Sequence, residues 1–444
     1  MKKKQNAFFF RVSALLLIFC LLTSAFCACG KAPSSGDMED SGFEMMPAET
    51  ETPSVEPPRP VATASLGVVG DILIHDTVYN SAKAAGGGAY DFTEQYELVA
   101  PYLKKYDLSV ANLEVTLGGE KPVVGKYPSA YPCFNCPDSI IDALKGAGVD
   151  LLLTANNHSY DTRGAGMIRT VQVVREKGLD YLGTRDKTDE SFYKVKEVNG
   201  IKLGMACFTY STVNSSGIKA LNGITMTRDD GPLVSSFAYT DLEGFYREAE
   251  NAIKEMEAGG AEFLVFYMHW GNEYQYVPNS YQTKMAKKLC EMGVDVIVGG
   301  HPHVIQPFET ITAENGNETL CIYSTGNAIS NQRKFLMDSD NYSGHTEDGM
   351  IFGVTFERWS DGSLRIGGVD IQPLWVIRES RGGRLVFQII PLDLTVADWK
   401  SFHLNDATLK EAKASYNRTM KLVGKGLNAA REKLGQTPVV TSVS

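Results

Sequence analysis

The chain has 444 residues, of which 43% are hydrophobic and 22% charged, and its formal net charge is −10. This length allows one large domain or two smaller ones, and the apolar content is typical of a globular protein. So acidic a chain is a poor nucleic-acid binder, and we expect no nucleic-acid partner.

The first residues predict an export signal. Residues 2–4 are three lysines, residues 8–22 are mostly apolar, and Cys27-Ala28-Cys29-Gly30 follows. Cys29 resembles the lipidated cysteine of a bacterial lipoprotein, although Phe26 is unusual at its position; an uncleaved N-terminal anchor is the alternative. Either form places the protein at the cell membrane, tethered on the extracellular face. Removing residues 1–28 takes away four basic residues and no acid, so the formal charge falls from −10 to −14.

Residues 29–60 are rich in Pro, Ser, Glu and Met without a sustained apolar period, and we predict a disordered tether. A folded domain is expected over residues 61–396, followed by a C-terminal helical extension over residues 397–444.

Strands and helices are predicted to alternate along the domain. Asp138 is expected to cap a helix that ends at Gly146 and Gly148, and Asn199-Gly200 predicts a hairpin. Residues 331–349 are polar and predict a loop, and residues 349–394 return to strand-like alternation. These features indicate an α/β layered domain. Buried strands are predicted at residues 66–70, 107–111, 149–154, 263–268 and 294–300, with a further strand reaching residues 324–327, and helices at residues 164–177, 241–258, 281–292 and 406–434.

Polar groups that can bind metals stand just past the ends of these strands. One such group alone is more often a capping or hydrogen-bonding residue. Together, carboxylate, imidazole and amide oxygen donors suit Zn, Mn or Fe, and loops beyond strand ends are where α/β proteins place their chemistry. The candidates are Asp71, Glu114, Asn157, His158, His269, His301 and His303.

The cysteines of the body predict no metal site. Cys133 and Cys136 form a C-x-x-C without a second pair or nearby histidines, so a zinc knuckle is not expected. A local disulfide and two free thiols are both compatible with an exported protein.

Six segments together resemble the bacterial CapA/PgsA poly-γ-glutamate capsule biosynthesis family. They occur in the family's order over roughly residues 64–330. The resemblance implies similarity to the calcineurin-like metallophosphoesterases, hence a four-layer αββα sandwich with a two-metal centre, in a membrane-anchored protein facing outward. The segments are Gly70-Asp71-Ile72-Leu73, Asn112-Leu113-Glu114, Ala155-Asn156-Asn157-His158 with Asp161 and Gly164, His269-Trp270-Gly271-Asn272-Glu273-Tyr274, Gly300-His301-Pro302-His303 and Ser324-Thr325-Gly326-Asn327.

The resemblance also implies a role for each candidate. Asp71 and His303 would bind one divalent metal ion, and Glu114 would bridge to a second ion held by Asn157, His269 and His301. His158 would donate a proton to the leaving group. Two such cations lower the pKa of a shared water and neutralise an anionic substrate.

Further residues are expected on the substrate side. Arg163 follows His158 and is expected to clamp an anion, since guanidinium pairs with carboxylate and phosphate. Glu273 and Tyr274 are expected to line the pocket. Gln306 and Asn327 are expected to contact substrate or metal-bound water, with loop scaffolding as the alternative.

Two departures from the metallophosphoesterase pattern leave three hypotheses. Leu73 stands where the first motif usually has His, and Glu114 stands where the second has Asp. The first hypothesis is a metal-dependent hydrolase acting on an anionic polymer or phosphoester in capsule or envelope synthesis. The second is a non-catalytic scaffold that binds the polymer or a membrane synthase partner. The third is a 5′-nucleotidase-like phosphatase.

Overall fold

The computed structural model describes residues 56–338 and 343–444. The expected signal segment, Cys29 and most of the expected tether lie outside these residues. Pro57–Ser444 is a single compact unit, and its first strand begins at Pro60, close to the predicted start of the domain. Within the part of the chain that the structure describes, no helix has the length and apolar character needed to span a bilayer.

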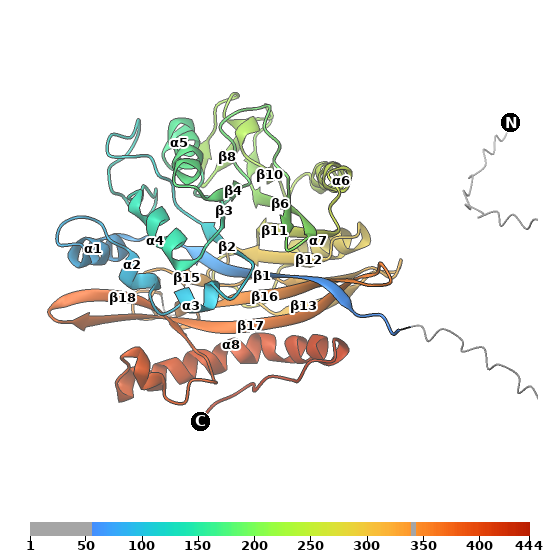
Figure 1. The fold of residues 1–444 in the computed structure, drawn as a ribbon. Helices are drawn as coiled ribbons and strands as arrows, with labels where there is room; N and C mark the ends of the chain where they lie inside the picture. The colour runs from blue at the N-terminus through green and yellow to red at the C-terminus, as the bar shows by residue number, and fades with distance from the viewer. Residues whose placement is uncertain (1–55, 339–342) are drawn as a thin grey trace, which may run out of the picture. The chain divides into compact units, whose positions relative to one another are not determined.

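The first sheet carries the N-terminal and C-terminal strands of the domain. Its order is β18-β17-β16-β1-β2-β3-β4, and β15 pairs with β1 at one end (Figure 1). Strands β1 to β4 run parallel, and β16 to β18 form an antiparallel meander on β1. The strands are β1 Pro60–Ile72, β2 Leu108–Leu113, β3 Leu151–Leu153, β4 Asp180–Leu182, β15 Asn327–Ile329, β16 Asp348–Trp359, β17 Leu364–Arg381 and β18 Arg384–Pro391.

The second sheet comes from the middle of the chain. Its order is β10-β6-β11-β12-β14-β13, with β5 paired to β6 by the predicted hairpin at Asn199-Gly200. A small sheet, β7-β8-β9, follows β6. The strands are β5 Lys194–Val198, β6 Ile201–Tyr210, β7 Thr212–Val213, β8 Lys219–Leu221, β9 Ile224–Thr225, β10 Ser236–Phe237, β11 Phe263–His269, β12 Val296–Gly300, β13 Phe308–Thr312 and β14 Glu318–Ile322.

Three apolar clusters define the layers. One lies between the two sheets, the second packs helices α1 to α5 on the first sheet, and the third packs α6 and α7 on the second. Burial of apolar side chains is the main stabilising term of such packing. The predicted four-layer αββα arrangement is therefore confirmed. The helices are α1 Asp76–Ala85, α2 Thr93–Tyr96, α3 Ala100–Leu103, α4 Ser139–Ala147, α5 Arg163–Glu176, α6 Leu242–Ala258 and α7 Ser280–Glu291.

The last helix, α8 (Asp406–Lys433), packs against β17 of one sheet and β13 of the other (Figure 1). Its buried Tyr416, Met420 and Leu427 belong to the same cluster that fills the space between the sheets. At Gly426 a Cβ atom would lie 1.9 Å from the carbonyl oxygen of Phe308, so only glycine allows this approach. The helix thus closes one side of the inter-sheet core.

Local details differ from the sequence predictions. Asp138 precedes α4 without capping it, because its carboxylate accepts two hydrogen bonds from Arg169. The helix also continues through Gly146 and ends at Ala147, followed by Gly148 with a φ of 100°. The strand expected to reach Asn327 ends at Ile322; Asn327 instead begins β15 in the other sheet. Cys133 and Cys136 are free thiols.

Candidate metal centre

The parallel strands of both sheets bring their carboxyl ends to one edge. Asp71 in β1 pairs in register with Asn112 in β2, and His269 in β11 pairs with Gly300 in β12. Strands β1 and β12 are in contact across the two sheets. Residues that follow any of these four strands therefore meet in one place, and carboxyl strand ends are where open α/β sheets bind ligands.

The turn after β12 holds its two histidines in a constrained backbone. Gly299 passes so close to the residue that follows β14 that a Cβ atom would lie 1.9 Å from the carbonyl oxygen of Tyr323. His301 and His303 have φ values of 94° and 56°, which non-glycine residues seldom adopt. The backbone N–H of His301 donates to Asp71 Oδ2 at 3.1 Å. Strain of this kind persists where the surrounding structure imposes it, and it concentrates at functional sites.

The expected ligands form two groups that share one carboxylate. Asp71, Glu114 and His303 make one group, and Glu114, His269 and His301 make the other; within each group the ligand atoms lie within 4.8 Å of one another. Glu114 therefore occupies the position of a bridging residue between two sites.

Asn157 joins the second group. Its Oδ1 lies 2.7 Å from His269 Nε2, which in turn lies 3.3 Å from Glu114 Oε1. Each of these atoms is a donor type found around Zn, Mn and Fe. The structure thus brings together all six residues expected to bind metal.

Two buried atoms of this centre lack a hydrogen-bond partner in the described chain, Glu114 Oε1 and His301 Nδ1. The side chains of Glu114 and Asp71 are fully buried, and no ion pair within residues 56–338 and 343–444 joins either to Lys or Arg. Unpaired buried groups are costly. Divalent cations fit this centre because they would bind the orphaned atoms and neutralise the carboxylates.

The protonation of the centre follows from burial and close charges. Burial alone would raise the pKa of Asp71, but the hydrogen bond and charge of His303 lower it below its usual value. Burial lowers the pKa of His301 well below the usual value, which favours the neutral imidazole that binds metals. Burial also acts to lower the pKa of His303, but the charges of Glu114 and Asp71 raise it to about 9.

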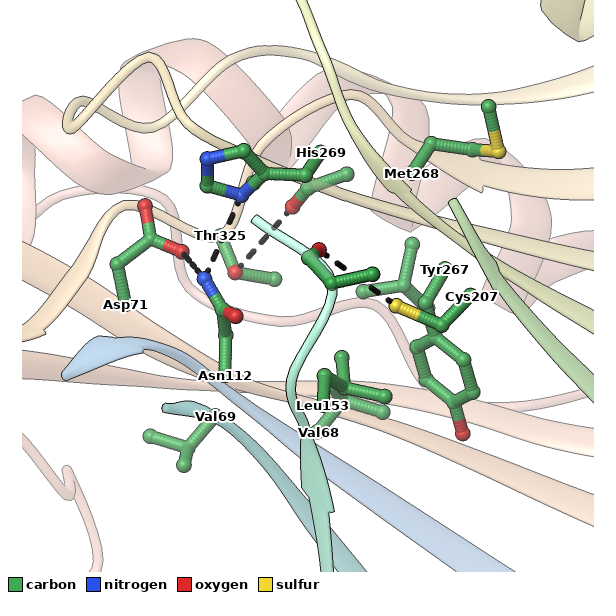
Figure 2. A pocket seen from close by; sticks show the side chains of 14 residues that line it. Val68, Val69, Asp71, Asn112, Leu153, Cys207, Tyr267, Met268, His269 and Thr325 are labelled. Atoms are coloured by element: carbon green, nitrogen blue, oxygen red, sulfur yellow. Dashed lines mark hydrogen bonds between the residues drawn. The ribbon is translucent and has the colours of Figure 1, made fainter. Parts of the chain in front are cut away.

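A small cavity of about 20 Å³ lies beneath the ligands, lined by Asp71, Asn112 and His269 among others. Figure 2 shows the Asn112 amide between Asp71 and His269; its Nδ2 donates to Asp71 Oδ1 at 2.7 Å and lies 3.5 Å from His269 Nδ1. Sequence reasoning did not single out Asn112 as a site residue. Its place two residues before Glu114, at the end of β2, was the available signal.

His158 is held by a carboxylate that sequence reasoning left without a role. His158 Nδ1 lies 2.8 Å from Asp161 Oδ2, and this oxygen also accepts a hydrogen bond from the Phe134 N–H at 2.7 Å. Burial would lower the pKa of His158, but the hydrogen bond and charge of Asp161 raise it. The contact fixes Nδ1 as the bonded nitrogen and leaves Nε2 for proton transfer.

Two of the residues considered for substrate contact, Gln306 and Asn327, are hydrogen-bonded within the protein. Gln306 is fully buried; its Nε2 donates to the Gln275 carbonyl, and its Oε1 accepts from Gln282. Buried Asn327 accepts a hydrogen bond from His303 Nδ1 at 3.1 Å through its Oδ1. Both side chains therefore have hydrogen-bond partners within the protein, as the scaffolding alternative expects.

The other expected substrate residues lie nearer the solvent. Arg163 is half-buried and donates to the carbonyl oxygen of Asp161 at 3.1 Å. The Tyr274 ring centroid lies 6.2 Å from that of His303. Exposed Glu273 forms a third metal-capable group with His301 and His303, a placement that the sequence did not suggest.

Comparison with known sequences identifies one family. The model described as "Bacterial capsule synthesis protein PGA_cap" matches residues 65–332, more than half of the chain. The capsule biosynthesis protein CapA of Bacillus anthracis is 28% identical over 275 residues, which cover 60% of each chain. The PGA biosynthesis protein CapA of Bacillus subtilis is 28% identical over 65% of this chain and 68% of its own. The match therefore spans less than two thirds of the B. anthracis relative.

Solved structures show weaker likenesses. NAD nucleotidase (NadN) of Haemophilus influenzae aligns with a TM-score of 0.40 and 12% identity, over 84% of this chain and 66% of that chain. The calcineurin-like phosphoesterase YfkN of Bacillus subtilis aligns with a TM-score of 0.35 and 16% identity, over 79% and 99%. At such scores these likenesses carry no conclusion about activity.

Proposed function

The chain belongs to the bacterial capsule synthesis protein family PGA_cap, and from this premise we propose that it is a metal-dependent hydrolase acting on an anionic envelope polymer or phosphoester. The observation that carries the proposal is the pair of ligand groups sharing Glu114, with buried Glu114 Oε1 and His301 Nδ1 lacking hydrogen bonds in the described chain. Poly-γ-glutamate is the first polymer to test, because the two curated relatives are named for capsule or PGA biosynthesis.

Each part of the centre has a task in this proposal. Asp71 and His303 would hold one cation, Asn157, His269 and His301 would hold the other, and Glu114 would join them. When bound, two cations supply Lewis acidity and offset the charge of an anionic substrate. Asn112 keeps the Asp71 carboxylate in place through its 2.7 Å hydrogen bond.

His158 is the proton donor in this mechanism. Asp161 holds its Nδ1 and raises its pKa, which favours the protonated imidazole whose Nε2 proton can go to a leaving group. A positioned acid of this kind contributes about 10²–10⁴-fold to rate. The edge-on contact of the Phe134 ring, 4.8 Å between centroids, restrains the imidazole plane.

The experiment measures bound metal on the purified protein and turnover of a chromogenic phosphodiester and of poly-γ-glutamate. We expect His158→Ala to lower turnover by about 10²–10⁴-fold while the metal content stays that of wild type. His403→Asn, in the segment before α8, is the matched histidine control and should keep full turnover. Protein that holds no metal and turns over neither substrate would rule out the hydrolase.

A non-catalytic scaffold is the second candidate, and Leu73 favours it. Leu73 is 2% exposed and packs in the apolar cluster at the position where metallophosphoesterases usually carry a metal-binding histidine. The scaffold would bind the polymer or a membrane synthase partner, and it predicts that His158→Ala leaves polymer export intact. A histidine variant as defective in export as a deletion strain would reject the scaffold.

We further propose that the protein is a lipoprotein tethered through Cys29 to the outer face of the cell membrane. The support is the basic, apolar and Cys-containing order of residues 1–30. Metabolic labelling with a fatty-acid analogue should mark the wild-type protein and leave Cys29→Ser unmarked. Equal labelling of both proteins would reject lipidation at Cys29.

A further inference from the structure

Glu273 lies against both halves of the candidate metal centre. Its carboxylate forms a group with His301 and His303 in which the ligand atoms lie within 4.8 Å of one another. His301 belongs to the Glu114–His269 group, and His303 belongs to the Asp71–Glu114 group. Glu273 is therefore placed, like Glu114, within reach of both proposed metal positions.

The two carboxylates differ in exposure. Glu114 is fully buried, whereas Glu273 is exposed; His301 and His303 are 4% and 1% exposed. Glu114 thus closes the centre from inside the protein, and Glu273 stands on the side that solvent and substrate reach. An exposed carboxylate can bind and release a metal ion at a lower free-energy cost than a buried one, because water solvates it after release.

The loop that carries Glu273 is tied to the protein on both sides of it. The N–H of Gly271 donates to the Tyr239 hydroxyl and the N–H of Tyr274 donates to the Pro302 carbonyl, both at 2.8 Å. Tyr274 has a φ of 63°, a strained value for a tyrosine. Because Pro302 lies between the two histidines, this bond holds Glu273 at a set place beside them.

A second structural observation, an unpartnered buried atom, points from this place to a ligand. His301 Nδ1 is buried and unpartnered within the described chain, and His301 is a member of the group that Glu273 completes.

We propose that Glu273 is an outer metal ligand shared by both metal positions and displaced by the anionic group of the substrate. It completes the coordination when no substrate is present, and a phosphoryl or carboxylate oxygen takes its place on binding. The inference rests on the proposed metal centre and assigns Glu273 to the metal rather than to the pocket wall.

The test is calorimetric titration of the metal-stripped full chain with Mn²⁺, and then of the metal-loaded protein with inorganic phosphate. We expect Glu273→Gln and Glu273→Ala to weaken binding of at least one Mn²⁺ equivalent by about 10-fold or more. The same variants, once loaded, should bind phosphate severalfold more tightly than wild type, because the competing carboxylate is gone. Glu250→Gln, at an exposed position of α6, is the matched control and should change neither.

The contrary outcomes separate this inference from the proposed function. If the Glu273 variants bind manganese within twofold of wild type, Glu273 is not a metal ligand. If they also bind phosphate more weakly, Glu273 contacts the substrate as part of the pocket wall. Weaker manganese binding with unchanged phosphate affinity would overturn the displacement. A wild-type chain that takes up no metal would refute the metal centre itself, whereas two equivalents bound with wild-type affinity in every variant would refute only the role of Glu273.

Discussion

Two neighbouring regions of this protein bury carboxylates equally deeply and treat their charge in opposite ways. In the candidate metal centre Asp71 and Glu114 have no arginine or lysine partner within the described residues. In the second region, which we call the arginine network, Arg418 of α8 binds buried Asp348 through two hydrogen bonds of 2.7 and 2.6 Å. Arg333 likewise pairs with Glu347 at 3.0 Å.

The two regions are adjacent, with Asn327 between them. Asn327, which binds His303, also donates to the carbonyl oxygen of Thr346, next to Glu347. Arginine side chains pair with the buried carboxylates of the arginine network, whereas no arginine or lysine within the described residues pairs with Asp71 or Glu114. A buried carboxylate that is paired only with histidines lacks the permanent positive charge that an arginine supplies, so Asp71 and Glu114 form a site that cations from solution can complete.

The largest expected effect lies in the arginine network. Arg418→Met removes the partner of a buried carboxylate and should lower the free energy of unfolding by about 3–5 kcal/mol, measured by urea denaturation of metal-free protein. Arg365→Met breaks an exposed pair with Asp361 and should cost at most about 1 kcal/mol. If Arg418→Met lowered the free energy of unfolding no more than Arg365→Met does, the proposed difference between the two regions would be wrong.

Bound metal should stabilise the folded protein at the candidate metal centre, as Arg418 does in the arginine network. Mn²⁺ or Zn²⁺ at about 100 times its dissociation constant should raise the free energy of unfolding by about 2.7 kcal/mol. Glu114→Gln should abolish most of this gain, because both ligand groups use Glu114. Without metal the same variant loses the pairing of Glu114 with His269 and His303, so its metal-free stability should fall by less than the metal-dependent gain that it abolishes; an equal or larger fall would contradict the interpretation.

The two regions should also respond to acid in opposite directions. Because the hydrogen bond and charge of His303 outweigh burial and lower the pKa of Asp71, its contribution to stability is present above the unfolded value of about 4 and is lost as pH falls through the folded value. Burial raises the pKa of Asp348 despite Arg418, so its contribution is full below about pH 4 and is lost as pH rises through the folded value.

The measurement is thermal unfolding of metal-free protein between pH 3 and pH 7. Asp71→Asn should cost more stability at pH 7 than at pH 3, and Asp348→Asn should cost more at pH 3 than at pH 7. Parallel pH profiles for the two variants would show that the regions hold their carboxylates in the same way.

The sequence predicted the centre better than it predicted the network. Every expected metal ligand follows or ends a buried strand, and parallel strands bring their ends together whatever else the fold does. The arginine network depends on α8 meeting β16, two elements whose paired residues lie 70 positions apart, and no local pattern encodes that contact. Tertiary packing likewise decided that Asp138 binds Arg169 instead of capping α4, and that β13, a short half-exposed strand, forms beside α8.

The smallest expected effect concerns Arg163, the positive charge nearest the proton donor in sequence. Its guanidinium donates to a backbone carbonyl, and within the described residues no acidic side chain is paired with it. Arg163→Ala should therefore change the free energy of unfolding by no more than about 0.5 kcal/mol.

If the guanidinium turns toward an anionic substrate, the variant should raise KM severalfold and leave kcat near wild type, because a group that binds ground state and transition state alike alters only KM. Arg163→Lys should recover part of the loss, since it keeps the charge without the paired donors. An unchanged KM for both variants would mean that the metals alone attract the anion, and the contrast between the two regions would then be sharper: the centre would depend for its positive charge on ions from solution and not on any arginine of the chain.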